Sequence, residues 1–223
     1  MTTLFVTASG TDVGKTFVML RLIDELTAAG YRVCALKPVA SGFDAANPGA
    51  SDTGALLRAQ GRVLDIANLD AVSPWRFAAP LSPDMAAARE RHAVPFAALV
   101  DFCRAPRDAD VTLIEGVGGV MVPLDDTHTV LDWLAALDAP ALLVVGSYLG
   151  TLSHSLTAAA ALRTRGARIA GVVVSESAEQ PVPAAETATV LARFLRPTPV
   201  QVLPRHAPRG AAPLLPLMAP HLR

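Results

Sequence analysis

The sequence predicts an α/β fold of the P-loop NTPase type, in which a mostly parallel sheet is flanked by helices on both faces. Two observations support this prediction. Short runs of β-branched and apolar residues recur along the 223 residues, and a helical pattern follows nearly every run. The first run leads into a turn that contains glycine, ends in Gly-Lys-Thr and opens a helix. We expect residues 1–223 to form a single P-loop ATPase domain.

The expected strands read as near-continuous apolar runs, which is typical of parallel strands buried on both faces. They are Leu4–Thr7, Val33–Val39, Val111–Ile114, Ala141–Val145, Ile169–Val174 and Pro199–Val202. The expected helices are Lys15–Ala29, Thr53–Gln60, Phe96–Arg104, Thr129–Leu137, Thr151–Thr164 and Ala184–Leu195. Segment 73–83 is rich in proline and interrupts this alternation, so we expect an ordered loop or cover rather than a linker. The proline-rich tail 207–223 is expected to pack irregularly on the body or on a partner subunit.

The composition excludes several classes of partner. The formal charge is −1, with 52% hydrophobic and 17% charged residues, so the chain has a large core but no basic surface for nucleic acid or anionic membrane. No apolar stretch approaches the ~20 residues of a membrane-spanning helix, and no signal-like leader opens the sequence. Cys34 and Cys103 lack metal-ligand spacing and are expected to be reduced thiols. We therefore expect a cytoplasmic protein.

The turn after the first strand has the chemistry of a phosphate-binding loop. It reads Ala-Ser-Gly-Thr-Asp-Val-Gly-Lys-Thr from Ala8 to Thr16. Glycines let backbone N–H groups converge on phosphate oxygens, and the helix N-terminus adds partial positive charge. Lys15 supplies a full charge, and the Thr16 hydroxyl can ligate Mg²⁺. Ser9 stands where the strict pattern has glycine, so the loop is a variant.

Further charged residues follow the expected strands. Lys37 ends the second strand, and Lys15 and Lys37 are the only lysines in the sequence, so both fall at the expected site. The alternative for Lys37 is a solvated surface position. Glu115 follows an apolar strand directly and precedes glycines, which indicates a carboxylate for Mg²⁺ rather than a solvated loop acid. Asp52 is either a site carboxylate or a helix N-cap, and His154 is either a substrate contact or, as we favour, an anchor for its turn.

Together these segments resemble the dethiobiotin synthetase family. The resemblance covers the chain to about Arg205 and rests on Gly10–Thr16, Lys37–Gly42, Ser51-Asp52, 77–83, Glu115–Gly119 and Leu149–His154. It implies a homodimeric enzyme of biotin biosynthesis that uses Mg²⁺ and ATP. In the implied reaction 7,8-diaminononanoate takes up CO₂ as a carbamate, which attacks the terminal phosphate of ATP. The second amine then closes the ring on the mixed anhydride, which gives dethiobiotin, ADP and phosphate.

The resemblance also implies roles for individual residues. Lys15 and Lys37 would be catalytic, stabilising the transferring phosphoryl group, and the Mg²⁺ ligands would be Thr16, Asp52 and Glu115. The implied ATP-binding residues are Thr11, Asp12, Val13, Gly14, Lys15, Thr16, Phe17, Asp52, Glu115, Gly116, Val117, Gly118, Ser175, Glu176, Pro204, Arg205 and His206. The implied substrate contacts are Ser41 and, from a helix N-terminus of the neighbouring subunit, Gly150, Thr151 and Ser153.

Three residues depart from the family pattern. Ala8 stands where the lengthened loop usually begins with glycine, and Ser153 replaces a commoner asparagine in the carboxylate turn. Ser175 occupies the place where an asparagine commonly reads adenine, so the base preference is left open.

Two other classes of protein compete with this interpretation. A partitioning or targeting ATPase carries a lysine early in its loop, but here Gly10 holds that position. A synthetase acting on a large cofactor acid usually adds a glutamine-hydrolysing domain, for which the chain has no room.

Overall fold

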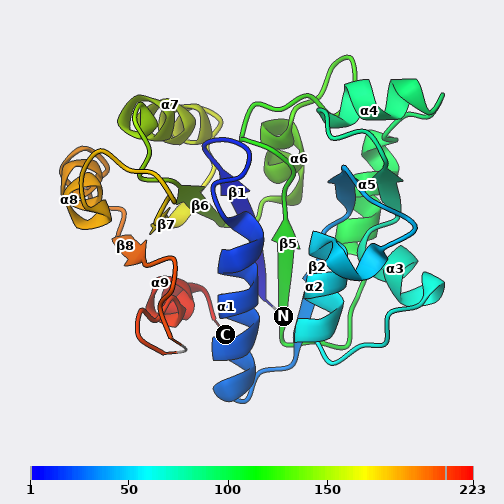
Figure 1. Cartoon of the computed structure of the whole chain (residues 1–223), viewed down its shortest axis with the longest axis horizontal. Helices are drawn as coiled ribbons and strands as arrows, with labels where there is room; N and C mark the ends of the chain where they lie inside the picture. The colour runs from blue at the N-terminus through cyan, green and yellow to red at the C-terminus, as the bar shows by residue number, and fades with distance from the viewer. Residues whose placement is uncertain (1, 209, 223) are drawn as a thin grey trace.

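The computed structural model describes residues 2–208 and 210–222. Within these ranges six strands form one parallel sheet in the order β2-β5-β1-β6-β7-β8, and β3 pairs with β4 in a separate parallel sheet (Figure 1). The strands are β1 Thr2–Ala8, β2 Val33–Leu36, β3 Val39–Ser41, β4 Trp75–Phe77, β5 Val111–Glu115, β6 Ala141–Val145, β7 Ile169–Ser175 and β8 Val200–Leu203. The α-helices are α1 Lys15–Ala28, α2 Asp52–Ala59, α3 Ile66–Val72, α4 Pro83–Arg89, α5 Phe96–Arg104, α6 Val130–Leu137, α7 Thr151–Thr164, α8 Ala184–Phe194 and α9 Leu215–Met218, with short 3-10 turns η1 Pro48–Ala50 and η2 Ala219–His221.

Helices cover both faces of the main sheet, so the predicted fold class is confirmed. Successive side chains of a strand point to opposite faces. On β1, Phe5 belongs to the cluster beneath α5, α6, α7 and α8, whereas Leu4 and Val6 belong to the cluster beneath α1, α2, α3 and α9. The central strands β1, β5 and β6 are thus buried on both sides, which explains their near-continuous apolar runs, whereas the edge strands β2 and β8 are partly exposed. That the chain forms a single domain remains a prediction.

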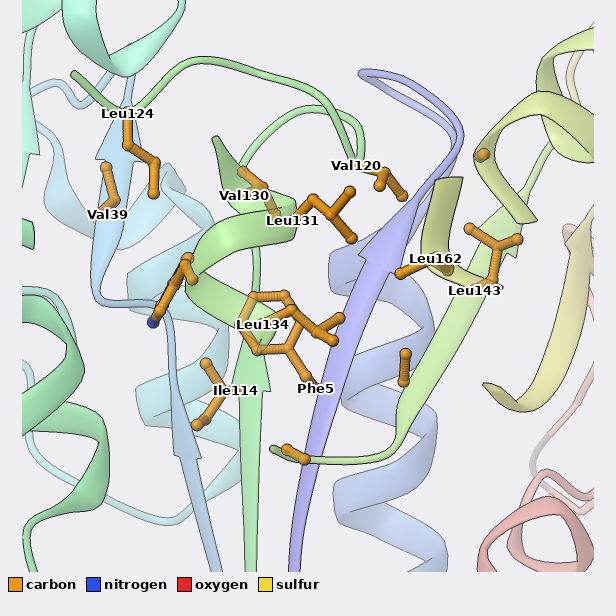
Figure 2. Packing of buried hydrophobic residues seen from close by; sticks show 14 of the residues in the cluster. Phe5, Val39, Ile114, Val120, Leu124, Val130, Leu131, Leu134, Leu143 and Leu162 are labelled. Atoms are coloured by element: carbon orange, nitrogen blue, oxygen red, sulfur yellow. The ribbon is translucent and has the colours of Figure 1, made fainter. Parts of the chain in front are cut away.

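The first of these clusters holds α6 tightly against the centre of the sheet. Leu134 of α6 lies close to Phe5, and Leu131 lies nearer to Val120 (Figure 2). The Phe5 and Trp133 rings meet edge to face, with 4.8 Å between their centroids. Thr129 begins α6 with a reciprocal capping box, in which its side chain and that of Asp132 each bond to the other's backbone N–H. This packing also fixes the chain between β5 and α6, which carries part of the site described below.

The prediction of a single strand at Val33–Val39 is wrong. β2 ends at Leu36, and β3 begins at Val39 in the second sheet, paired with β4. Pro38 lies between them and has no N–H to donate to a ladder. Its carbonyl accepts from Trp75 N at 3.1 Å, so the break starts the second sheet. Segment 73–83, expected to be a loop, therefore contains β4 and leads into α4.

The C-terminal tail packs on the body of the protein. It contains α9 and η2, and α9 lies beside α1 (Figure 1). Leu214 and Met218 are fully buried, and a Cβ added at Gly171 of β7 would lie 3.1 Å from a Leu217 methyl group. The sequence left open whether the tail packs on the body or on a partner subunit, and the structure shows that it packs on the body. Among residues 2–208 and 210–222, no helix combines the length and hydropathy needed to span a bilayer.

Candidate active site

The turn between β1 and α1 is shaped by residues that adopt left-handed backbone conformations. Gly14 has φ 94° and stands at the N-terminus of α1, and Asp12 has φ 56°. The Lys15 ammonium donates to the carbonyl of Gly118 at 2.8 Å and to that of Gly10 at 3.4 Å. Lys15 thus bridges the turn and the segment that follows β5, two parts of the chain that are far apart in sequence.

Four side chains meet where β2 and β5 end. Glu115 is the last residue of β5 and is fully buried. One of its oxygens, Oε1, accepts from Thr16 Oγ1 at 2.8 Å and from Lys37 Nζ at 2.7 Å. Lys37 also forms an ion pair with Asp52 at the start of α2. Leu36 and Ile114 lie opposite each other in the ladder, so the parallel register of β2 and β5 brings Lys37 and Glu115 to the same sheet edge.

The two lysines have opposite electrostatic environments. Burial, opposed by the Glu115 carboxylate and aided by the charge of Lys37, lowers the pKa of Lys15 from 10.5 to about 8. Burial also disfavours the charged form of Lys37, but Glu115 and Asp52 outweigh it and raise its pKa above the ordinary value. Asp52 is partly desolvated, yet Lys37 holds its pKa below the ordinary value. Two carboxylates thus hold Lys37 as a cation, whereas Lys15 has carbonyl partners and is less basic than an exposed lysine.

These groups line a cavity of about 580 Å³. The residues predicted from the sequence that line it are Thr11, Asp12, Gly14, Lys15, Thr16, Lys37, Ser41, Asp52, Glu115, Val117 and Gly118. Sequence reasoning did not assign Pro80, Leu81, Ser82, Pro83 and Val122 to the site, although they also line it. The segment 77–83 contributed to the family resemblance, but only the structure shows that Pro80–Pro83 line the same cavity as the two lysines.

A second cavity of about 520 Å³ adjoins the first at the turn, because Asp12 and Gly14 line both. Its other predicted members are Val13, Phe17, Ser175, Glu176, Arg205 and His206, and sequence reasoning missed Ser177 and Ala178. Ser175, at the end of β7, lies so close to the turn that a Cβ added at Gly14 would be 2.5 Å from its hydroxyl. Gly14 is therefore required both for its backbone conformation and for this approach.

Comparisons with known proteins agree with this geometry. A family model described as an AAA domain matches residues 2–207. An ATP-dependent dethiobiotin synthetase from Acidiphilium cryptum is 50% identical over 207 residues, which cover 91% of this chain and 92% of that protein. The chain belongs to the ATP-dependent dethiobiotin synthetase family. A member from Methylobacterium nodulans is 48% identical over 200 residues, covering 86% of this chain and 89% of the relative.

Solved structures show a similar fold at greater evolutionary distance. The signal recognition particle receptor FtsY from Elizabethkingia anophelis superposes with a TM-score of 0.52 at 16% identity, covering 90% of this chain and 58% of the receptor. At that identity the likeness concerns the fold alone.

Some residues implied by the dethiobiotin synthetase family line neither cavity. Gly116 packs against the core instead, because a Cβ there would lie 2.9 Å from the Phe5 ring. Pro204 precedes the two cavity residues Arg205 and His206. Three others begin α7: Gly150 with φ 95°, Thr151, whose hydroxyl donates to Gly146 O at 2.7 Å, and the exposed Ser153. The roles of all these residues remain predictions.

The structure shows the contacts of Asp52 and His154, two residues for which the sequence left alternatives open. Ser51 caps α2 by accepting from Gly54 N at 3.1 Å, so Asp52 is not the cap and its carboxylate pairs with Lys37. His154 donates its backbone N–H to Gly150 O, and its ring bonds to the Tyr148 hydroxyl at 2.9 Å. These bonds support the anchoring role that we favoured, and a contact with substrate is not tested by them.

Proposed function

We propose that this chain catalyses the ATP-dependent carboxylation and ring closure of 7,8-diaminononanoate to dethiobiotin, with release of ADP and phosphate. One observation carries the proposal: Lys15, Lys37 and Glu115 converge in a single cavity beside the phosphate-binding turn. The family's ATP dependence and the size of the adjoining cavity support it further.

The two lysines would bring two anions together. A carbamate and a triphosphate repel each other in water, and ammonium groups at the contact screen that repulsion. Lys37 is 7% exposed and is held by two carboxylates, so its charge is oriented before the substrates bind. Lys15 would exchange its present partners for the phosphate oxygens of ATP. Those partners are carbonyl oxygens, which bind an ammonium group more weakly than a polyanion does.

The reaction needs no side-chain nucleophile, because the substrate supplies both attacking groups. A carbamate oxygen attacks the terminal phosphorus while the bond to the bridging oxygen breaks, and ADP leaves with that electron pair. The second amine then attacks the carbamoyl carbon, expels phosphate and loses a proton. The residues' contribution is to hold both reactants in line, which is worth roughly 7–11 kcal/mol in favourable cases. Ser41, whose buried hydroxyl has no hydrogen-bond partner in the described chain, would bond the substrate.

The residues present fit a Mg²⁺ site. Glu115 Oε2 is buried without a hydrogen-bond partner, and Thr16 and Asp52 place further oxygen donors beside it. The described chain holds no group of three or more His, Cys, Asp or Glu side chains able to bind a metal by themselves. Phosphate oxygens of ATP would therefore complete the set. When bound, the ion would neutralise charge on the phosphates.

The second cavity would hold the base and ribose of ATP, between Phe17 and the residues after β7 and β8. The substrate carboxylate would bind Gly150, Thr151 and Ser153 of a second subunit, since these residues line neither cavity of their own chain. Leu149 is 84% exposed beside them, as expected of a surface that a second copy covers. The cytoplasmic location and the absence of nucleic-acid and membrane partners stay predictions.

One assay tests the proposal. Phosphate release is followed with ATP and Mg²⁺ alone, then with bicarbonate, then with bicarbonate and the diamine. We expect turnover only with the complete set, together with dethiobiotin in a one-to-one ratio to phosphate. Phosphate release at the same rate without the diamine would exclude the synthetase reaction.

A further inference from the structure

The wall of the second cavity is continuous with the C-terminal segment. Arg205 and His206 line the cavity, in a loop that follows β8 directly. On the cavity side, Glu176 holds this loop, because its Oε2 accepts from Arg205 N at 3.0 Å. Gln180 donates to the other oxygen at 2.8 Å and so orients the carboxylate. The loop is thus fixed at its first half by residues that follow β7.

Helix α1 fixes the second half of the loop and the segment beyond it. Arg21 Nη2 donates to Pro208 O at 2.6 Å. One turn further along α1, Glu25 Oε2 accepts from the backbone N–H groups of both Leu214 and Leu215 at 2.8 Å. Arg21 is only 7% exposed. Burying a charged side chain costs desolvation free energy, and hydrogen bonds to backbone groups offset part of that cost.

The anchored segment is part of the hydrophobic core. Leu214, Leu217 and Met218 belong to the cluster beneath α1, and Leu217 lies against Gly171 of β7. The segment therefore fills the space between α1 and the β7 side of the sheet, as Figure 1 shows for α9. Its position relative to α1 is consequently well defined.

Helix α1 also carries the phosphate-binding residues at its N-terminus and Phe17 on the wall of the second cavity. Under the proposed function, the same helix would contact both the phosphates and the base, and it also anchors the chain that follows the base loop. A loop held in its binding conformation before the ligand arrives loses less conformational entropy on binding.

We propose that the described C-terminal residues 207–208 and 210–222 complete the nucleotide site, with Arg21 and Glu25 acting as positioning residues that hold loop 204–208 in its ATP-binding conformation. This inference rests on the proposed placement of the base in the second cavity. It predicts a defect confined to ligands that carry a base, because the phosphate-binding turn has its own contacts with the rest of the site.

The test compares two ligands in the full-length protein. Arg21→Met keeps the aliphatic stem without the donor, and Glu25→Gln keeps the shape without the charge. Titration calorimetry measures binding of Mg-ATP and of Mg-tripolyphosphate, which lacks a base. We expect the dissociation constant for ATP to rise about tenfold in either variant, the effect of losing a hydrogen bond to a charged group. Binding of tripolyphosphate and the KM for the diamine should stay unchanged, and Arg21→Lys should recover part of the affinity.

Arg163→Met serves as the matched control. Arg163 of α7 likewise donates from a side chain to a backbone carbonyl, Leu195 O at 2.7 Å, but away from the loop. It should bind both ligands as the wild type does. Equal weakening of both ligands in Arg21→Met and Glu25→Gln, or no weakening of either, would overturn the proposal.

A further variant separates this proposal from the assignment of the base site. Arg205→Ala combined with His206→Ala alters the loop itself. Weaker ATP binding in this double variant, with normal binding in Arg21→Met and Glu25→Gln, would reject the positioning role alone. Normal ATP binding in the double variant would reject the base assignment and the positioning role with it.

Discussion

At the scale of single residues, the site depends on how Lys37 and Glu115 share a buried position. The Glu115 side chain is fully buried and that of Lys37 is 8% exposed, so each carries a charge that water cannot stabilise. Asp52 joins them from a half-exposed position at the start of α2. Lys37 is thus both a candidate catalytic cation and the group that makes the buried Glu115 carboxylate tolerable.

Replacing Lys37 by alanine should therefore have two effects. We expect kcat to fall by orders of magnitude, because the ammonium acts chiefly on the transition state. We also expect a loss of stability of about 3–5 kcal/mol, since removal of one partner leaves a buried charge unpaired. Single-turnover kinetics and urea unfolding measure the two effects. The double variant Lys37→Ala with Glu115→Gln should regain stability but not activity, and wild-type turnover in either variant would remove Lys37 from the mechanism.

At the scale of elements, the placement of α2 decides where Asp52 lies. Gly54 packs against η1, and a Cβ there would lie 2.4 Å from Pro48 O and 3.0 Å from the backbone of Gly49. Backbone atoms cannot move aside as a flexible side chain does. Together with the Ser51 cap, this close approach fixes the first turn of α2.

Gly54→Ala should accordingly displace that turn. We expect a loss of stability of about 1–3 kcal/mol from overpacking and a lower turnover as Asp52 moves from Lys37. Thermal unfolding and steady-state kinetics test this expectation. Ala55→Gly is the matched control in the same helix: it should cost stability through helix propensity, about 1 kcal/mol, and leave turnover unchanged. Full activity in a destabilised Gly54→Ala would show that the position of Asp52 is unimportant.

The packing of α5 against the sheet makes stability sensitive to alkaline pH. Burial raises the pKa of the Cys103 thiol from 9.0 to about 12, outweighing the Trp133 side chain, which favours the thiolate. Between these values the unfolded chain releases a proton that the folded chain retains. The contribution to stability is thus complete below pH 9 and is lost as pH rises towards 12, at up to about 1.4 kcal/mol per pH unit.

Urea unfolding of the wild type and of Cys103→Ala at pH 8 to 11 measures this effect. The difference in unfolding free energy between the two proteins should shrink as pH rises, whereas groups common to both cancel. A difference that stays constant with pH would show that the thiol ionises equally in the folded and unfolded chains.

At the scale of the whole molecule, we propose that two copies of the chain form each complete substrate site. The start of α7 lines neither cavity but presents Leu149 and Leu152 to the surface, 84% and 37% exposed. Leu149→Asp combined with Leu152→Asp should abolish dimer formation and raise the KM for the diamine strongly. The KM for ATP should change little, because both cavities around the nucleotide belong to one chain.

Sedimentation equilibrium and steady-state kinetics measure these outcomes. Ile66→Asp is a suitable control, since Ile66 is 75% exposed on α3, which lies on the opposite side of the molecule from α7 (Figure 1). It should leave both the dimer and the kinetics unchanged. A fully active monomer would contradict the role proposed for the second subunit.

Local sequence determined the alternating strands and helices, the phosphate-binding turn and the chemical identity of Lys15, Lys37 and Glu115. These features are readable because hydrophobic periodicity and glycine-rich turns depend on neighbouring residues. The end of β2 at Leu36 was less readable, since an apolar run continues through Pro38 and only pairing partners show which sheet Val39 joins.

Only the tertiary structure decided which distant segments meet. The cover formed by Pro80–Pro83, the ion pair of Asp52 with Lys37, and the bonds from Arg21 and Glu25 to the C-terminal segment each join residues that no local spacing relates. Such contacts arise when the whole core packs, because buried charges and backbone groups must then find partners wherever the fold brings them.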